Sequence, residues 1–222
     1  MDVREALYTT RAMRRVRPDP IPADVQARIL DAAIRAPSGG NAQGWRFLLV
    51  DDPTVKEQLG PLYRDAIGRL WQTAYADRIE RARGAPDDPD RAALLRVVSS
   101  AQHLADHFEQ VPLYLFGLSR GDASGGSIFP AVWSAQLAAR SEGVGSALTS
   151  VLGIFHGAEA MQILGVPEGK GWVMACCVSF GYPTGRWGVA ARRPAHEVAY
   201  RNHWGNPVGF EIAEPLWPER GA

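Results

Sequence analysis

The order of apolar and polar positions predicts helices alternating with a few strands. Residues 45–50 form an apolar run directly after a turn, and residues 111–119 and 172–180 are longer apolar runs typical of buried strands. A helical face precedes the first of these runs, with apolar residues three or four apart at Val25, Ile29, Ala32, Ala33 and Ala36. The pattern therefore predicts both helices and strands within one folded chain.

Cap residues indicate where the first helices begin. Asp2, with Glu5 three residues later, has the form of a capping box. Pro22 suits the first position of the next helix, because its missing N–H would have no partner there. Asp52 and Pro53 are typical of the cap and the first residue of a third helix.

The stretch from residue 62 to 110 has a helical composition and is expected to form a lid or insertion of two helices. The run Arg83-Gly84-Ala85-Pro86-Asp87-Asp88-Pro89 would form an exposed bend between them. Aromatic residues in the first helix either cover a planar ligand or pack in the core. Beyond this stretch, a long helix is expected to begin at Pro130 and a shorter one to span residues 158–164.

Length and charge limit the possible functions. The 222 residues are enough for one sizeable core, and no linker rich in Ser, Pro or Gly divides them, so we expect a single domain over 1–222. Lys plus Arg and Asp plus Glu both number 24, which argues against nucleic acid as a partner. No apolar run approaches the roughly 20 residues of a membrane span. The start of the chain has no signal-peptide pattern, so we expect a cytoplasmic protein without membrane contact.

Cys176 and Cys177 are adjacent in a strand-like run. Successive side chains of a strand point to opposite faces, and a disulfide between neighbours would be strained. We therefore expect two small buried thiols.

The candidate chemistry begins with an arginine cluster. Arg11, Arg14 and Arg15 follow the first expected helix, and guanidinium groups suit a phosphate and the electron-rich edge of a ring. One helix later, residues 38–41 form a tight turn that a planar ligand could approach closely. Either feature alone is compatible with a solvated surface or a simple loop. Their order, with a strand directly after the turn, predicts a site for flavin mononucleotide (FMN).

These motifs resemble those of the nitroreductase family of FMN flavoproteins. Residues 11–16 are similar to the family's first arginine-rich pattern, and residues 36–47 share its Ala-Pro-Ser, Asn, Gln, Trp and Phe positions. Residues 127–150 resemble its flavin-contacting helix and the following turn, and residues 181–194 its Gly-Tyr-Pro and Arg-Arg-Pro motifs. The resemblance implies an α+β fold with three layers, α/β/α. In it, a mostly antiparallel sheet is flanked by helices, and the C-terminal tails are swapped in a homodimer.

The resemblance also implies cofactor contacts. Arg14 is the expected stabiliser of charge on the reduced flavin. The candidates for the phosphate are Arg11 and Arg15 on one side and Arg192 and Arg193 on the other, and the choice within each pair is open. The residues expected near the reactive N5 atom, in a turn, are Leu148, Thr149 and Ser150. Those expected to reach the neighbouring subunit's flavin are Ile128, Phe129 and Pro130. The other expected flavin contacts are Ala12, Met13, Pro37, Ser38, Gly39, Asn41 and Gln43.

Three departures from the family pattern affect the substrate pocket more than the flavin site. Ala12 stands where serine is usual, Gly44 replaces a proline and is expected to loosen its turn, and Trp133-Ser134 replaces a Gln-Asn pair. The residues expected to contact the substrate are Tyr63, Trp71, Tyr75 and Phe129.

The expected function is that of an FMN-dependent oxidoreductase. It would take hydride from NADH or NADPH and then, at the same site, reduce a nitroaromatic or quinone acceptor. The flavin is the reactive centre, so no side chain is assigned as catalytic acid or base. The alternatives are a reductive dehalogenase, a flavin-fragmenting enzyme of the same family, and a non-catalytic flavin-binding or storage module.

Other motifs in the sequence give weaker evidence for a function. His103 and His107 are four residues apart, but the glutamate of an HExxH motif is absent, so we predict no metal site. Arg120-Gly121-Asp122 spells an adhesion tripeptide and receives no role. No GxGxxG motif opens a helix, which argues against a resident dinucleotide fold.

The C-terminal segment 195–222 is apolar in places and has no strong periodicity. Its large rings, including Trp204, Phe210 and Trp217, would be costly to leave in water. We therefore expect this tail to wrap around the partner subunit of the homodimer.

Overall fold

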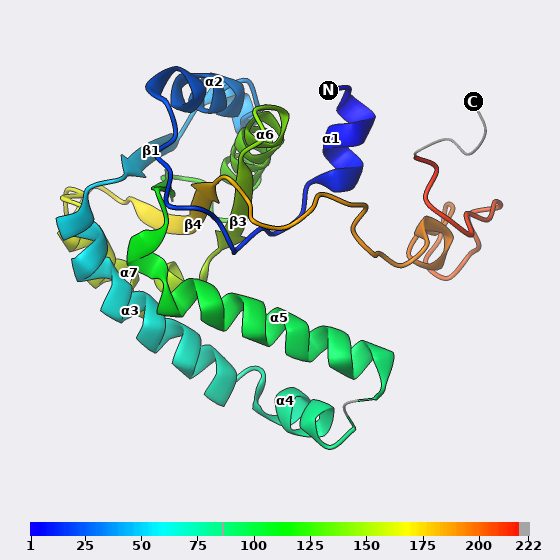
Figure 1. Ribbon diagram of the computed structural model, residues 1–222. Coiled ribbons are helices and arrows are strands. Elements are labelled where there is room, and N and C mark those ends of the chain that lie inside the picture. The colour runs from blue at the N-terminus through cyan, green and yellow to red at the C-terminus, as the bar shows by residue number, and fades with distance from the viewer. Residues whose placement is uncertain (86, 218–222) are drawn as a thin grey trace. The chain divides into compact units, whose positions relative to one another are not determined.

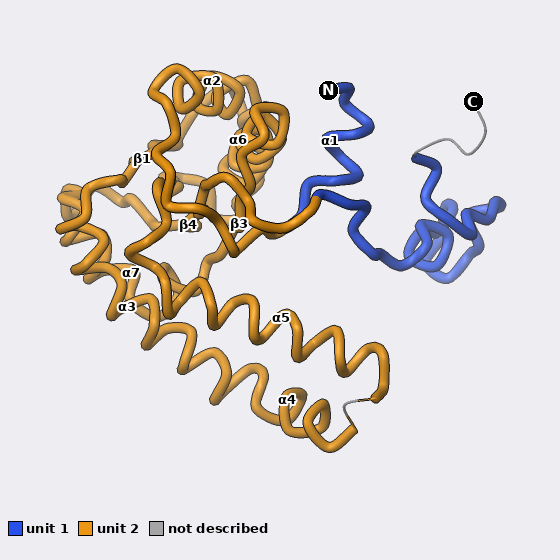
Figure 2. Tube along the Cα trace, viewed as in Figure 1, with its two compact units in different colours: residues 1–11, 187–222 blue, residues 12–186 orange. Residues whose placement is uncertain are grey.

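The computed structural model describes residues 1–85 and 87–217. The chain forms two compact units, shown in different colours in Figure 2. Unit 1 consists of Met1–Arg11 together with the chain from Trp187, and unit 2 is Ala12–Arg186. Each unit is described by itself.

The centre of unit 2 is a four-stranded sheet with the order β1-β2-β4-β3 (Figure 1). The strands are β1 (Trp45–Val50), β2 (Leu113–Ser119), β3 (Gly145–Thr149) and β4 (Val173–Gly181). Every neighbouring pair is antiparallel. β1 and β3 are therefore the two edges. The register brings the start of β1, the end of β2, the start of β4 and the end of β3 to one end of the sheet.

Helices cover both faces of this sheet, as Figure 1 shows. On one face, α2 (Ala23–Ala33) and α6 (Ile128–Ser141) bury their apolar sides against Trp45, Leu115 and Cys176. On the other, α3 (Pro53–Gln72), α5 (Pro89–Asp106) and α7 (Val151–Ile163) share a core with Phe116 and Cys177. The α+β, three-layer prediction is confirmed. Both cysteines are buried and free, as expected.

The predicted caps agree closely with the structure. Asp2 Oδ1 accepts a hydrogen bond of 2.8 Å from the Glu5 amide at the start of α1 (Val3–Thr9). Asp52 caps α3, and Pro53 is its first residue. Pro22 is the residue before α2 and not its first position.

The described part of the region 62–110 contains three α-helices where two were expected, and a short 3-10 helix, Phe108–Gln110, follows them. α3 continues through Pro61 to Gln72, α4 (Ala76–Arg83) follows a short turn, and α5 begins at Pro89 after the expected bend. The turn between α3 and α4 contains neither glycine nor proline, so the sequence gives no signal for it. Pro86, within the bend, lies outside the described residues.

The predictions between Pro130 and residue 164 need correction. α6 begins at Ile128, two residues before Pro130. Leu148 and Thr149 belong to strand β3, not to a turn, and Ser150 is the residue before α7. The prediction missed β3 because Gly145, Ser146 and Ala147 give no apolar alternation. α7 begins well before residue 158, and a Cβ at its Gly153 would lie 2.6 Å from the Met174 carbonyl oxygen. Glycine at this position therefore allows α7 to pack closely on β4.

Unit 1 joins the two ends of the chain. The Ala190 amide donates to the Tyr8 carbonyl oxygen at 3.3 Å, and the rings of Tyr8 and Trp217 lie 5.9 Å apart. Within the tail, the Ile212 amide donates to Nδ1 of His196 at 3.0 Å. Trp204 is 91% exposed. The last five residues of the predicted tail, 218–222, lie outside the described residues. Among the described helices, none combines the length and apolar character of a membrane span.

Candidate functional site

The segment of residues 12–17 is held along the β3 edge of the sheet by its backbone. The Met13 amide donates to the Ser146 carbonyl oxygen at 2.8 Å, and the Arg17 amide to the Tyr182 carbonyl oxygen at 2.8 Å. The Thr184 amide donates to the Arg15 carbonyl oxygen at 3.0 Å. These bonds fix the chain on both sides of Arg14.

Arg14 is half-buried, and burial lowers its pKa although the neighbouring Tyr63 opposes the shift. Tyr63, from α3, is only 2% exposed, and burial raises the pKa of its phenol to about 12. A hydrogen bond from Thr149, at the end of β3, acts against that rise. The structure therefore brings together the expected charge stabiliser, one of the expected N5 neighbours and a buried neutral phenol.

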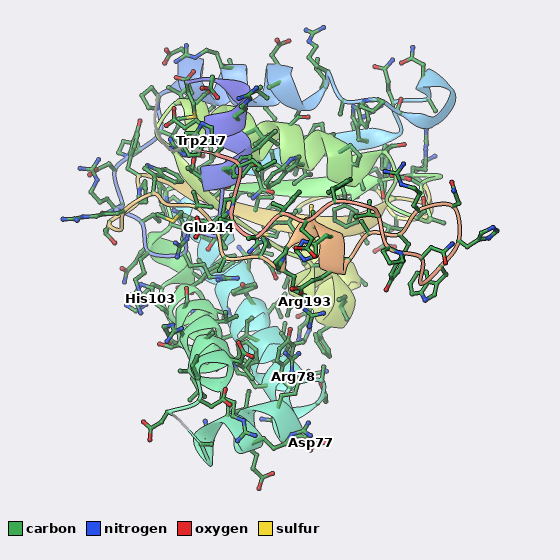
Figure 3. The ribbon with its side chains drawn as sticks, turned by 90° about the vertical axis from the view of Figure 1, so that its right-hand side faces the viewer. Asp77, Arg78, His103, Arg193, Glu214 and Trp217 are labelled. Atoms are coloured by element: carbon green, nitrogen blue, oxygen red, sulfur yellow. The ribbon has the colours of Figure 1, made fainter. Side chains whose placement is uncertain are left out.

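Arg15 reaches helix α5. Its Nη1 donates to Nδ1 of His103 at 3.0 Å, and the rings of His103 and His107 stack with centroids 4.1 Å apart. Nδ1 of His107 donates to the His103 carbonyl oxygen at 2.9 Å. Figure 3 labels His103 on α5, and Asp77 and Arg78 mark α4 at the tip of the helical layer. The two histidines thus pack together. Among the described residues there is no group of three His, Cys, Asp or Glu side chains that could hold a metal ion.

The turn of residues 38–43 has an unusual backbone. Gly40, Asn41 and Gln43 all have positive φ, at 57°, 53° and 48°, a conformation that costs free energy for residues other than glycine. Ser38 Oγ accepts from the Gln43 amide at 3.2 Å, and Gln43 Nε2 donates to Asn41 Oδ1 at 3.1 Å. A Cβ at Gly39 or Gly40 would meet no atom within 4 Å. The turn therefore presents open backbone surface.

Gly44 does not loosen this turn as the sequence suggested. A Cβ there would lie 2.5 Å from the carbonyl oxygen of Arg120, and the Arg120 amide donates to the Gly44 carbonyl oxygen at 2.8 Å. Glycine at this position allows β1 and β2 to continue their close approach by one more residue pair.

The start of α6 lies beside the same turn. The Gly39 amide donates to Ser127 Oγ at 3.3 Å. Asp122 Oδ2 accepts from the amides of Ser127 and Ile128 at 3.1 and 2.8 Å, which satisfies the first turn of the helix. Ile128 is buried in the core, whereas Phe129 is 39% and Trp133 40% exposed on α6.

Two adjoining pockets surround the loop between β2 and α6. The larger, about 690 Å³, has Phe129, Val173 and Ala175 on its apolar side and also reaches Ser150. The smaller, about 320 Å³, is lined by Arg120 and by Gly39 and Gly44 of the 38–43 turn region. Gly121, Asp122 and Ser124 line both, so the pockets are adjacent. Phe129 and Ser150, both predicted cofactor contacts, therefore share one cavity.

Most of the predicted site residues of unit 2 can be grouped by the edge of the sheet to which they lie nearer. The β3-edge group comprises Ala12, Met13, Arg14, Arg15, Tyr63, Leu148, Thr149 and Ser150. The β1-edge group comprises Pro37, Ser38, Gly39, Asn41 and Gln43. Ile128, Phe129 and Pro130 begin α6, which packs on β2 and β3. Neighbouring strands are about 4.8 Å apart, so edges separated by two inner strands lie about 15 Å apart. Arg11, Arg192 and Arg193 belong to unit 1, so their predicted phosphate contacts stay predictions.

Two of the predicted substrate residues lie further out on the helical layer. Trp71 and Tyr75 form an edge-to-face pair with ring centroids 5.5 Å apart, and Trp71 Nε1 donates to Gln102 Oε1 at 3.0 Å. Trp71 lines a separate pocket of about 470 Å³ with Glu80 and Arg83 of α4.

Sequence reasoning missed several residues that shape the site. Ser127 contacts the turn, Ser146 anchors Met13, and Arg120 and Asp122 line the pockets. Ser127 stands next to Ile128, and the Arg-Gly-Asp run was noticed but received no role. Ser146 lies in the strand that the apolar pattern did not predict.

Comparison with known proteins identifies the family. A family model described as Nitroreductase family matches residues 7–182. The chain belongs to the nitroreductase family. An NADH dehydrogenase from Thermus thermophilus is 44% identical over 59 residues, which is 27% of this chain and 29% of that relative. The matched stretch thus spans less than a third of either protein.

Solved nitroreductase-fold structures resemble nearly the whole chain at low sequence identity. Iodotyrosine deiodinase bound to FMN and 3-iodo-L-tyrosine has a TM-score of 0.71 at 20% identity, covering 91% of this chain and 99% of that one. The FMN-dependent nitroreductase NfnB from Mycobacterium smegmatis, in complex with NADPH, has a TM-score of 0.64 at 20% identity, covering 89% and 96%. At this identity the likeness establishes the fold.

Proposed function

We propose that this nitroreductase-family protein is an FMN-dependent oxidoreductase that uses NADH or NADPH to reduce a small aromatic acceptor. The observation that carries the proposal is the position of Arg14, half-buried and fixed by the backbone beside Tyr63 and Thr149. Family membership supports it, as do two compared proteins described with FMN, one of them in complex with NADPH.

The residues present fit the cofactor. A fixed guanidinium suits the anionic edge of a flavin, and the open backbone at Gly39 and Gly40 suits a planar ring. Bound FMN would supply the centre that accepts hydride from a nicotinamide and passes it to an acceptor. Arg14 then lowers the free energy of the negative charge that develops there, and Asn41 and Gln43 offer amide groups to the polar edge. Arg11, Arg15, Arg192 and Arg193 stay our candidates for the phosphate.

The division of the site into two edge groups supports a homodimer with composite sites. In one chain the 38–43 turn leads into one edge strand and Arg14 lies beside the other, so a second copy placing its 38–43 turn against the first chain's Arg14 would complete each site. The exposed rings of Trp204 and Phe210 in the tail, 91% and 51% accessible, suit burial against a partner. Removing the chain after Pro194 should therefore yield protein without flavin that aggregates or fails to dimerise, as measured by sedimentation and absorbance. A flavin-loaded monomer would contradict this arrangement.

The main experiment separates flavin binding from flavin reduction. We expect the purified protein to carry FMN, and its flavin absorbance to bleach when NADH or NADPH is mixed in anaerobically. Arg14→Ala should slow this bleaching by about 10- to 100-fold and weaken FMN binding less, because its charge acts mainly on the reduced state. Arg17→Ala is the matched control, since Arg17 lies in the same segment in an exposed ion pair with Asp19.

The outcomes distinguish the functional classes. With NAD(P)H and a nitroaromatic or quinone, parallel double-reciprocal plots are expected, because both substrates use one site in turn. Flavin that neither nucleotide bleaches at millimolar concentration would indicate a storage or sensing module. Equal effects of the Arg14 and Arg17 substitutions would remove the assigned role of Arg14.

Reductive dehalogenation is the second candidate. The pocket at the α3–α4 turn has the indole of Trp71, the carboxylate of Glu80 and the guanidinium of Arg83 in its lining, groups that suit an aromatic zwitterion. Release of iodide from an iodinated tyrosine by the reduced protein, and its loss in Arg83→Gln, would favour this reaction over nitro or quinone reduction.

A further inference from the structure

We propose that Tyr63 is a positioning residue that makes the hydroxyl of Thr149 an obligatory hydrogen-bond donor toward the N5 atom of the flavin. The inference rests on the proposed function and deepens it, because it names the residue that sets the hydrogen bond at the reactive centre. The sequence suggested that Tyr63 contacts the substrate. Tyr63 is only 2% exposed, however, so it must act through a neighbouring group.

The register of the sheet places Thr149 on the face where Tyr63 lies. Thr149 of β3 pairs with Cys177 of β4, and residues directly opposite each other on antiparallel strands have their side chains on the same face. Cys177 and Tyr63 belong to the same core, under α3, α5 and α7. The hydrogen bond between the side chains of Tyr63 and Thr149 therefore connects α3 to the end of β3.

The phenol of Tyr63 is fixed in place and keeps its proton. Its ring lies 5.1 Å from that of Phe108, centroid to centroid, and Phe108 is fully buried. Burial raises the pKa of the phenol to about 12, so it is neutral at physiological pH. Within residues 1–85 and 87–217, Thr149 is the hydrogen-bond partner of this phenol and no second one exists. A buried donor without an acceptor is costly, so the neutral phenol donates to Thr149.

This bond determines what the Thr149 hydroxyl can do. A hydroxyl has two acceptor lone pairs and one proton to donate. Thr149 Oγ1 accepts from the Val151 amide at 3.3 Å, and the phenol of Tyr63 uses the other lone pair. The opposite direction, with Thr149 donating to Tyr63, belongs to the ionised phenol, which forms only near its raised pKa. Thr149 is half-buried, so its own proton is available to a bound ligand.

An obligatory donor at this position suits a flavin that accepts hydride. N5 of oxidised FMN carries a lone pair, and a hydrogen bond to it helps the ring to take up negative charge. Arg14, beside Tyr63, acts on the charge at the polar edge of the same ring. Tyr63 therefore supports the reaction without contacting flavin or substrate, because it prevents Thr149 from presenting a lone pair to N5.

The test compares two flavins that differ at N5 and requires no turnover. In 5-deaza-FMN a carbon bearing hydrogen replaces N5, so it cannot accept a hydrogen bond. The full-length FMN-loaded protein is dialysed to equilibrium against equal concentrations of FMN and 5-deaza-FMN, and the bound flavins are quantified by chromatography. We expect the wild type to prefer FMN by about 10-fold, because the obligatory donor has no acceptor in the analogue.

Variants then separate the two hydroxyls. Thr149→Val should bring the preference near one, and Thr149→Ser should retain it. Tyr63→Phe should lower it to about 3-fold, because the freed hydroxyl can then turn its proton away from the analogue. Adding Tyr63→Phe to Thr149→Val should change nothing further.

Tyr114→Phe is the matched control and should keep the wild-type preference. Tyr114 is 1% exposed in the same core, and its hydroxyl donates to the Phe108 carbonyl oxygen at 3.0 Å. This variant also loses a buried phenol hydroxyl, but not one bonded to Thr149.

Each other outcome overturns the positioning role. No preference in the wild type, an unchanged preference in Tyr63→Phe, an equal loss in Tyr114→Phe, or a further loss in the double variant would each do so. Anaerobic bleaching by NADH or NADPH separates this failure from failure of the proposed function. Bleaching with an unchanged preference in Tyr63→Phe removes the positioning role and keeps the oxidoreductase. The expected preferences without bleaching do the reverse, and a wild type that binds no FMN removes both.

Discussion

The two edges of the sheet carry the predicted site residues in different ways. At the β3 edge, the segment around Arg14 is bound to the sheet by backbone hydrogen bonds on both sides, so its path does not depend on its side chains. At the β1 edge, the 38–43 turn is held by side-chain oxygens of Ser38 and Ser127 and by three residues with positive φ. One edge is set by backbone hydrogen bonds between distant segments, and the other by local turn chemistry.

This difference predicts where the molecule tolerates substitution. Backbone hydrogen bonds hold the segment at the β3 edge whichever side chains it carries, so a single side chain there contributes little to its path. A strained turn depends on each of the few contacts that hold it. Substitutions at the β1 edge should therefore cost more stability than comparable ones at the β3 edge.

The largest effect is expected for Gly44→Ala. The new Cβ would lie 2.5 Å from the Arg120 carbonyl oxygen, and because that atom is backbone the strands must separate. We expect a loss of about 1–3 kcal/mol in the free energy of unfolding, measured with urea. Gly145→Ala at the β3 edge would place its Cβ 2.9 Å from Met13 Cβ and should cost less, because this approach is less close than the 2.5 Å at Gly44. Gly39→Ala, with open space around it, is the control, and equal losses in all three would refute the comparison.

A smaller effect is expected for Ser38→Ala. This change leaves the Gln43 amide without its hydrogen bond and should cost about 0.5–1.5 kcal/mol. Arg15→Ala removes only an exposed bond to His103 and should change the free energy of unfolding by less than about 0.5 kcal/mol. Thermal unfolding of the two variants under identical conditions compares their losses of stability. A larger cost for Arg15→Ala would mean that side chains, not backbone hydrogen bonds, hold the segment at the β3 edge.

The smallest effect concerns pH. Burial, with Arg15 and His107, lowers the pKa of His103, and Asp106 acts in the opposite direction. The unfolded chain therefore binds more protons than the folded one just below the ordinary histidine pKa of about 6.5, so stability falls as the pH falls through that range. Tm measured from pH 8 to 5 should decline less in His103→Gln than in the wild type. The cost of Ser38→Ala should stay constant with pH, because its hydrogen bond contains no titratable group.

The parts of the fold that sequence could predict are those with local signals. Asp2 and Asp52 mark helix starts because their side chains cap the first turn, and the apolar runs of β2 and β4 are long enough to be recognised as strands. The turn of residues 38–41 was found from its composition. In each case the physical cause lies within a few residues of the effect.

The parts that could not be predicted depend on distant contacts. β3 is a strand because Ser146 and Ala147 pair with β4, although its residues are small. The need for glycine at Gly44 comes from Arg120, 76 positions later, and that at Gly153 from Met174. The stacking of the Arg120 guanidinium on the Trp172 ring similarly joins two segments that no spacing rule connects. The sequence pattern therefore predicts the individual helices and strands. The arrangement of residues around the site depends on close contacts between segments that are distant in the sequence.

Labelling of the adjacent cysteines of β4 can show in which order the two helical layers detach from the sheet on unfolding. Cys176 faces the core under α2 and α6, and Cys177 the core under α3, α5 and α7. Burial raises the pKa of Cys176 to about 12 and that of Cys177 well above its ordinary value, so neither thiol should be alkylated in the native protein. Each thiol becomes reactive only when its own layer opens. In pulse labelling followed by mass spectrometry, doubly modified chains alone would mean that both layers detach together, and singly modified chains would identify the layer that leaves first.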